Sequence, residues 1–351
     1  MNRRQHLAQL GGVGLIALSG CLDTISGDET DVAVTDRTGQ RALDRAIGRL
    51  NEIAIELSAY TGTDSGTATG TDSDADTTTT GTTDTTATSS DTAFDPDPHH
   101  ERLESTRSFL DTAATELESD RQADVDLVRD YADVLEGLVS VTATVTDDEL
   151  ENEIEDVSAA FDTDADDEEA ADDRDNARDT LESRSGLIGD AQDLLESATQ
   201  TVEDFDDSRY ESLPTVDRAQ LVDGIEALES VLDSQAVLVA GYDELLAGYD
   251  ELETGREYSA DDEYGAAETA FLDAKLSFEA GTETIEDGRD GTPNELADAF
   301  KTAHCQGTHL QTAAAEFAAS AAAADDRDIA GAQKHQEGAE DALAAAGECG
   351  E

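Results

Sequence analysis

Apolar residues recur at helical spacing through most of this chain, and no segment shows a convincing strand-like alternation of apolar and polar residues. Segment 36–60 is a clear case. Its apolar positions fall on one side of a helix: Leu43, Ala46, Ile47, Leu50, Ala54 and Leu57. Aromatic residues make up only 4% of the chain and alanine is abundant, a composition that packs closely only between long helices. The sequence therefore predicts an all-α protein.

The expected helices follow one another with short connections. Besides 36–60, we expect them near residues 98–119, 121–146, 148–161, 170–203, 215–253, 260–287, 294–324 and 327–348. Short connections make antiparallel neighbours the default. The acidic run 162–175 interrupts the periodicity and is interpreted as a loop. The prediction for residues 97–351 is one helical domain, built as an antiparallel bundle or a short helical solenoid.

The N-terminus has the features of an export signal. Arg3 and Arg4 precede a short uncharged run, residues 7–20, which is too short for the ~20 apolar residues of a membrane span. A pair of arginines is typical of the twin-arginine route, although His6 stands where such signals usually carry a hydrophobic residue. We therefore expect twin-arginine export.

The end of this signal resembles the lipobox of exported lipoproteins, through the residues Leu18, Ser19, Gly20 and Cys21. In that family the cysteine is lipidated and becomes the new N-terminus. The resemblance implies a signal peptide over residues 1–20, a lipid on Cys21 and attachment to the outer face of the cell membrane.

Acidic residues outnumber basic ones by 85 to 21, which gives a formal net charge of -64. Together with only three lysines, this composition resembles that of proteins from extreme halophiles. Combined with the signal, the whole chain resembles the twin-arginine-exported lipoproteins of haloarchaea. Nucleic-acid binding needs a positive surface, so we expect no nucleic-acid partner.

Residues 21–60 are expected to form a spacer after the anchor and one amphipathic helix. Four arginines recur every fourth residue on its polar side: Arg37, Arg41, Arg45 and Arg49. We interpret them as a solvated face that pairs with Glu52, Glu56 or the acidic body. The alternative is contact with anionic lipid headgroups, because the helix lies close to the anchor in sequence.

Residues 61–96 are predicted to be a disordered linker rich in Thr, Ser, Asp and Gly. Residues 61–93 contain no lysine, no arginine and no hydrophobic residue larger than alanine, so this segment cannot bury enough surface to fold. Threonine-rich stalks of this kind are candidates for O-glycosylation.

One window resembles a single tetratricopeptide unit spanning residues 248–281. The matching positions are Gly255, Tyr258, Tyr264, Ala267, Phe271 and Ala274. The window departs from the family pattern at Thr254, Asp262 and Glu279, and no second copy occurs. The resemblance implies a helical hairpin that binds a peptide or protein, and an ordinary helical hairpin is the alternative.

No motif for catalysis or a cofactor is found in the mature chain. The acidic run could suggest calcium, but an EF-hand loop counted from Asp162 would need glycine and glutamate where Asp167 and Asp173 stand. We therefore expect no cofactor and no catalytic site.

The two remaining cysteines flank a turn expected near Arg327. Cys305 lies 22 residues before it and Cys349 22 residues after it, so both are ~33 Å from the turn in a helical hairpin. We predict a Cys305–Cys349 disulfide, favoured by alanine-lined faces that let the helices approach closely. The alternative is a metal site that uses Cys305 and His309, with His304 adjacent to Cys305. His335 should lie too far along the other helix to join it.

The sequence supports a first function hypothesis: a lipid-anchored helical module that contacts a protein or peptide at the cell surface. The second is a solute-binding lipoprotein of a transporter, which would normally have α/β lobes. The third is a surface enzyme without a recognisable motif.

We predict that the helical body unfolds reversibly as salt is withdrawn. Repulsion within a chain of net charge -64 must be screened, and the Debye length shortens from about 10 Å at 0.1 M to about 3 Å at 1 M salt. Circular dichroism from molar to millimolar salt should show a progressive loss of helix that recovers when salt is restored. An unchanged spectrum would show that the acidity does not set the stability.

Overall fold

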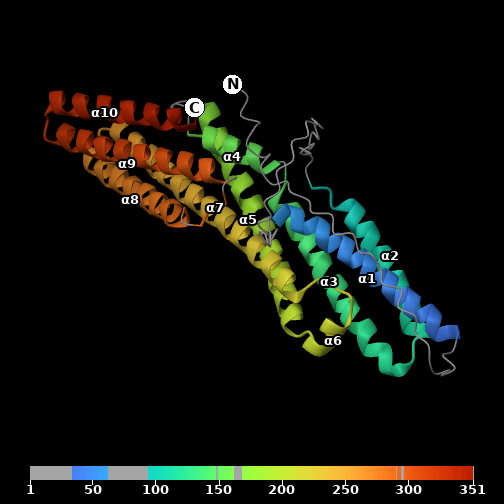
Figure 1. Ribbon diagram of the computed structural model, residues 1–351. Helices are drawn as coiled ribbons and strands as arrows, with labels where there is room; N and C mark the ends of the chain where they lie inside the picture. The colour runs from blue at the N-terminus through green and yellow to red at the C-terminus, as the bar shows by residue number, and fades with distance from the viewer. Residues whose placement is uncertain are drawn as a thin grey trace, which may run out of the picture. The chain divides into compact units, whose positions relative to one another are not determined.

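The computed structural model describes residues 34–61, 94–147, 149–161, 168–289, 291–293 and 296–350. All regular elements in these ranges are helical, so the predicted all-α class is confirmed (Figure 1). The α-helices are α1 (Val34–Thr61), α2 (Asp97–Glu116), α3 (Gln122–Val145), α4 (Glu149–Ala159), α5 (Glu168–Glu203), α6 (Asp207–Ser212), α7 (Arg218–Ala260), α8 (Tyr264–Gly288), α9 (Ala297–Asp325) and α10 (Ile329–Gly347). Two short 3-10 segments are η1 (Ser119–Arg121) and η2 (Glu348–Gly350).

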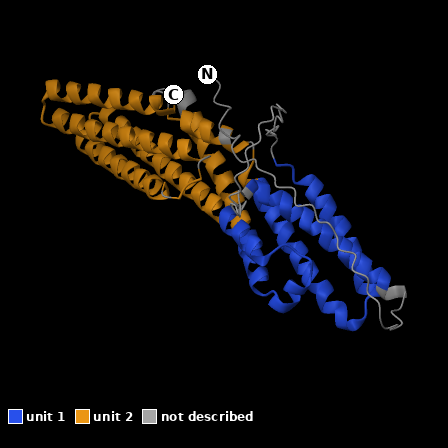
Figure 2. Cartoon of the chain, in the orientation of Figure 1, with its two compact units in different colours: residues 1–143, 194–228 blue, residues 144–193, 229–351 orange. Residues whose placement is uncertain are grey.

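The chain divides into two compact units rather than the single helical domain expected for 97–351 (Figure 2). Unit 1 comprises residues 1–143 and 194–228, and unit 2 comprises residues 144–193 and 229–351. Helices α5 and α7 contribute to both units, because their 36 and 43 residues are enough to enter two cores. Helix α1, expected to belong with the anchor segment, is part of unit 1.

Helix α1 buries its predicted apolar face in unit 1, against α2. Leu43, Ala46, Ile47, Leu50 and Leu57 are all buried, whereas Ala54 is half-buried. Ile53, which was not assigned to this face, is also fully buried. The buried side of α1 is therefore wider than the apolar face predicted from the sequence.

The linker ends earlier than predicted, because Phe94 belongs to the folded unit. Its side chain is buried and stacks on His99, with ring centroids 5.0 Å apart. The Tyr60 ring packs edge-on against it at 4.9 Å, which ties the end of α1 to the start of α2. Residues 62–93, the rest of the predicted linker, lie outside the described residues.

A seven-residue repeat organises the contact between α7 and α8 in unit 2. In the stretch GYDELLAGYDELETG, residues 241–255, glycine recurs at every seventh position, and apolar residues recur at the same interval on α8. The pairs are Gly241 with Ile285, Gly248 with Phe278 and Gly255 with Phe271. A Cβ atom placed on any of these glycines would lie within 3.0 Å of its partner side chain. Each glycine therefore provides the space that one large side chain occupies.

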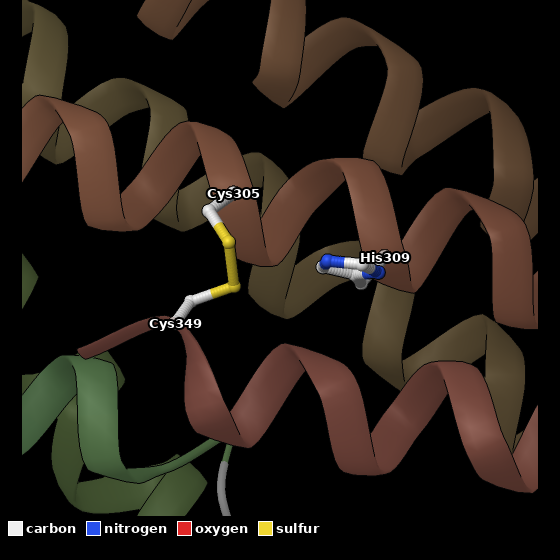
Figure 3. A group of neighbouring side chains, drawn as sticks. All are labelled: Cys305, His309 and Cys349. Carbon is white, nitrogen blue, oxygen red and sulfur yellow. A yellow bond between two sulfur atoms is a disulfide. The ribbon is translucent and has the colours of Figure 1, made fainter. Parts of the chain in front are cut away.

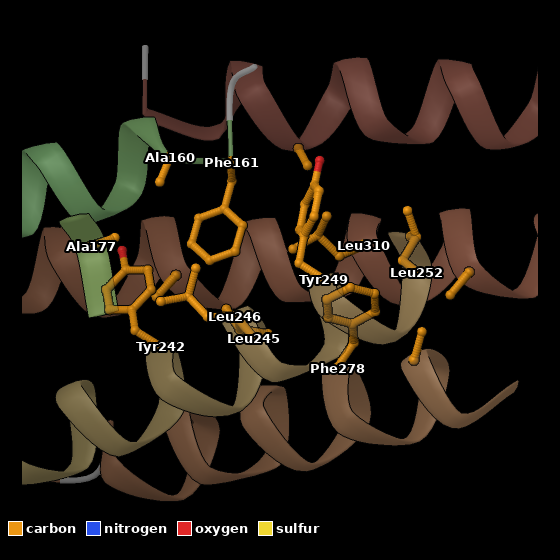
Figure 4. Packing of buried hydrophobic residues seen from close by; sticks show 14 of the residues in the cluster. Ala160, Phe161, Ala177, Tyr242, Leu245, Leu246, Tyr249, Leu252, Phe278 and Leu310 are labelled. Carbon is orange, nitrogen blue, oxygen red and sulfur yellow. The ribbon is translucent and has the colours of Figure 1, made fainter. Parts of the chain in front are cut away.

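The tyrosine after two of these glycines lies on the adjacent side of α7 (Figure 4). Tyr242 and Tyr249 are fully buried, with ring centroids 6.1 and 5.8 Å from that of Phe161. Phe161 follows α4, and the Tyr249 ring also lies 6.4 Å from the Phe278 ring of α8, so the tyrosines of α7 join the end of α4 to the contact between α7 and α8. The core of unit 2 is built around these contacts.

Helix α7 continues to Ala260, seven residues beyond the predicted end at 253. Gly255 therefore lies inside the helix, where the Phe271 ring requires its small size, instead of marking the helix end. The turn to α8 falls at Asp262, which has a positive φ of 61°. Two further differences are the short helix α6, which was not predicted, and the inclusion of residues 168–175 of the acidic run in α5.

The last hairpin, α9–α10, matches the prediction. The turn lies at Arg327, which has a φ of 65°, and the Asp328 carboxylate caps α10 by accepting a hydrogen bond of 3.0 Å from the Gly331 N–H. The alanine-lined faces meet as expected, with Ala332 only half-buried: Ala313, Ala314, Ala318 and Ala321 on α9, and Ala332, Ala339 and Ala346 on α10.

We predict that Gly248→Ala destabilises unit 2 by about 1–3 kcal/mol. The new Cβ would lie 2.7 Å from the buried Phe278 ring, and overpacking of this kind outweighs the better helix propensity of alanine. The urea midpoint at constant salt, followed by circular dichroism, measures the change.

Gly186→Ala in α5 is the matched control, since a Cβ there meets no atom within 4 Å. It should be neutral or stabilise by up to about 1 kcal/mol. Equal effects of the two substitutions would contradict the proposed role of the glycine repeat.

Candidate functional site

The clearest cluster of chemically versatile side chains lies at the open end of the α9–α10 hairpin, in unit 2. Cys305 and His309 lie one turn apart on α9, and Cys349 lies in η2 directly after α10 (Figure 3). All three side chains are half-buried. We call these three residues the Cys–His cluster.

Cys305 and Cys349 form a disulfide, as the sequence predicted. Their Cα atoms are 5.8 Å apart, well within the range that a disulfide spans. The pairing follows from the turn at Arg327, because equal lengths of helix bring both cysteines to the same level of the hairpin.

His309 completes a set of three potential metal ligands with the two cysteines. One ring nitrogen of His309 and both sulfur atoms lie within 4.8 Å of one another. The sequence suggested a metal site with Cys305 and His309 but did not include Cys349 in it. The hairpin register that places Cys349 beside Cys305 also places Cys349 about one helical turn from His309. Imidazole nitrogen and thiolate sulfur are the donors that zinc and other thiophilic metals prefer.

The other two histidines of the α9–α10 hairpin have different partners. His304 lies 3.8 Å from Glu286 of α8, and His335 lies 2.6 Å from Glu316. Glu316 is eleven residues from Cys305 along α9, or about 16 Å, so His335 is remote from the cluster as predicted.

The arginines of α1 form a second candidate surface, in unit 1. Arg37, Arg41 and Arg45 are exposed and form no ion pair with any described residue. Arg49 differs, because it donates a 2.8 Å hydrogen bond to Ser105 and lies over the Phe109 ring at 5.3 Å.

Arg37, Arg41 and Arg45 therefore lie on a solvated face, as the preferred interpretation expected, but the ion pairs expected with Glu52, Glu56 or the acidic body are not found among the described residues. Glu56, one expected partner, pairs instead with Arg102 of α2 at 2.5 Å. Three of the four guanidinium groups stay available to solvent or to an anionic surface.

Only some of the tetratricopeptide-like residues are buried in the structure. Gly255 and Phe271 are in contact, and Ala267 and Ala274 are fully buried. Tyr258, expected to pack as a knob, has an exposed fraction of 39%. Tyr264 is half-buried and donates a 2.8 Å hydrogen bond to Asp262 in the turn. The motif lies in a helical hairpin as expected, but that hairpin is much longer than a unit of ~34 residues.

The interior of unit 2 also holds a small cavity of about 20 Å³. Its lining is apolar except for a few polar groups, among them Arg184, Gln235 and Tyr242. Arg184 is buried and pairs with Glu153 at 2.5 Å and Asp147 at 3.4 Å. This volume is that of one water molecule, so the cavity is too small for a substrate in this conformation.

The predicted export and anchoring residues, Arg3, Arg4 and Cys21, lie outside the described residues, as do residues 162–167 of the acidic run. Among the described helices, none has the length and apolar character needed to span a membrane.

Comparisons of this chain with models of protein families, with curated proteins and with solved structures found no match. The candidate sites must therefore be judged on their own geometry.

We predict that Cys305→Ser, or chemical reduction, lowers the stability of the α9–α10 hairpin by about 2–4 kcal/mol. The disulfide closes a loop of 44 residues, and its loss frees the unfolded chain. Urea unfolding of the oxidised and reduced chains at constant salt measures the difference.

Cys349→Ser should have the same effect, and the double substitution should add nothing to either single one. Additive losses would show that each cysteine acts through its own packing and not through the bridge.

Proposed function

We propose that this protein is a lipid-anchored structural and binding module of the cell surface, with two helical units that contact a protein or peptide partner. The anchor would be a lipid on Cys21 after removal of residues 1–20. The Cys305–Cys349 disulfide carries this proposal, because such bonds persist in oxidising compartments and are rare in the reducing cytosol.

The position of α1 supports membrane attachment as well. Val34, where α1 begins, is 13 residues after Cys21, so a lipid there would hold the helix start within about 45 Å of the membrane. Arg37, Arg41 and Arg45 are exposed on this helix and could meet anionic headgroups. These three arginines place positive charge on one helix of a chain whose net charge is -64.

The geometry favours this module over a solute-binding lipoprotein. Such lipoproteins usually have α/β lobes with a ligand cleft between them, whereas the regular elements of the described residues are all helical. The cavity beside Arg184 holds no more than a water-sized molecule. The large core side chains of unit 2 pack against one another, and those that line this cavity, such as Leu238 and Tyr242, leave no more space than that.

We predict that Cys21→Ser releases the protein from the membrane or leaves it as an unprocessed precursor. Serine cannot take a thioether-linked lipid, and no described helix could span the membrane in its place. Fractionation of cells, with mass spectrometry of the N-terminal peptide, measures both outcomes. A Cys21→Ser protein that is processed normally and stays membrane-bound would contradict the anchor.

The double variant Cys305→Ser, Cys349→Ser is the control, because it removes the other two cysteines and should stay attached. Replacement of Arg3 and Arg4 by lysine tests the route separately, since it should block twin-arginine export. Unimpaired export would point to the general secretory route. Crosslinking in intact cells would then identify the partner.

A further inference from the structure

We propose that the Cys–His cluster is a redox-controlled metal site: the disulfide is its metal-free state, and the reduced thiols bind a thiophilic divalent cation together with His309. The proposal rests on one geometric fact, that both sulfur atoms and a ring nitrogen of His309 lie within 4.8 Å of one another. It does not depend on the lipid anchor. The disulfide and the metal site are then two states of the same residues.

The chemistry of the switch balances with an external thiol as reductant. Two thiols give two electrons and two protons to the Cys305–Cys349 bond and are oxidised to a disulfide, while the bond opens to two thiols. A metal ion then displaces both thiol protons and binds the thiolates. No metal can bind this way while the sulfur atoms are bonded to each other.

The spacing suits a tetrahedral ion. With metal–sulfur bonds of about 2.3 Å, two coordinated sulfur atoms lie about 3.8 Å apart, and a sulfur and an imidazole nitrogen slightly closer. All three donors of the cluster already lie within 4.8 Å of one another, and after reduction the two sulfur atoms have only to separate to about 3.8 Å.

Two elements hold the donors in place. Cys305 and His309 are fixed to one face of α9, and the hairpin brings Cys349 to them. All three side chains are half-buried, so the cluster can be reached from solvent.

Thermodynamic linkage makes the switch measurable without any activity assay. A metal that binds only the reduced form shifts the thiol–disulfide equilibrium by a factor of 1 + [M]/Kd. Free Zn²⁺ at ~100 times its Kd should therefore shift it about 100-fold, equivalent to raising the reduction potential by about 59 mV.

The test uses the full mature chain at constant salt, reduced and oxidised, titrated with Zn²⁺ and with Co²⁺. We expect one metal ion per reduced chain, a thiolate-to-cobalt charge-transfer band, and no such binding by the oxidised chain. Equal binding by the oxidised chain, no binding by the reduced chain, or one ion shared by two chains would overturn the proposal.

Substitutions then assign the ligands. His309→Ala should weaken Zn²⁺ binding at least 10-fold and reduce the potential shift, and Cys349→Ser should abolish the charge-transfer band. His304→Ala is the matched control, because His304 lies on the same helix but its ring is 3.8 Å from Glu286. If His304→Ala weakens binding as much as His309→Ala, or if His309→Ala has no effect, the ligand assignment is wrong.

Discussion

The glycine repeat of α7 is the contact on which the rest of unit 2 depends. Because Gly241, Gly248 and Gly255 have no side chains, α8 approaches closely enough for its large apolar residues to enter the space beside them. The same seven-residue period turns Tyr242 and Tyr249 toward Phe161. The few aromatic residues of this core therefore lie together, with Phe278 facing Gly248 and the Tyr249 ring at the same time. Close packing of this kind explains why unit 2 can be stable with so little apolar mass.

Repulsion between the many carboxylates of the chain opposes this close packing. In unit 1, partial desolvation and the nearby carboxylates of Asp133 and Asp126 raise the pKa of Asp130. Arginines have the opposite effect on Asp124. Burial alone would raise the pKa of Asp124, but hydrogen bonds from Arg121 and Arg209 outweigh burial and lower it. Arg37, Arg41 and Arg45 of α1 differ from these arginines, because they are exposed and form no ion pair with a described residue.

Sequence patterns predicted most of the helices, because the spacing of apolar residues along a helix can be read from the local sequence. The disulfide was predictable for a related reason, since one turn at Arg327 fixes the register of both helices. Errors arose where a residue serves a distant partner. The predicted helix end at 253 is too early, since α7 continues past Gly255, which contacts Phe271, and Phe94 was assigned to the linker although its ring stacks on His99. The third ligand of the Cys–His cluster was missed because His309 and Cys349 meet only through the hairpin.

The last hairpin shows why a link at its open end is useful to this fold. Every buried residue of α10 is an alanine: Ala339, Ala342 and Ala346. Burial of three methyl groups contributes about 2–3 kcal/mol in total, and Leu343 adds a partly buried side chain, which together are small against the entropy of ordering a helix of 19 residues. A disulfide contributes a similar amount through the unfolded state, and a metal bound by the same residues would restrain the hairpin at the same point. Either form of the Cys–His cluster would therefore hold α10 in place, whereas a reduced, metal-free cluster would remove this restraint.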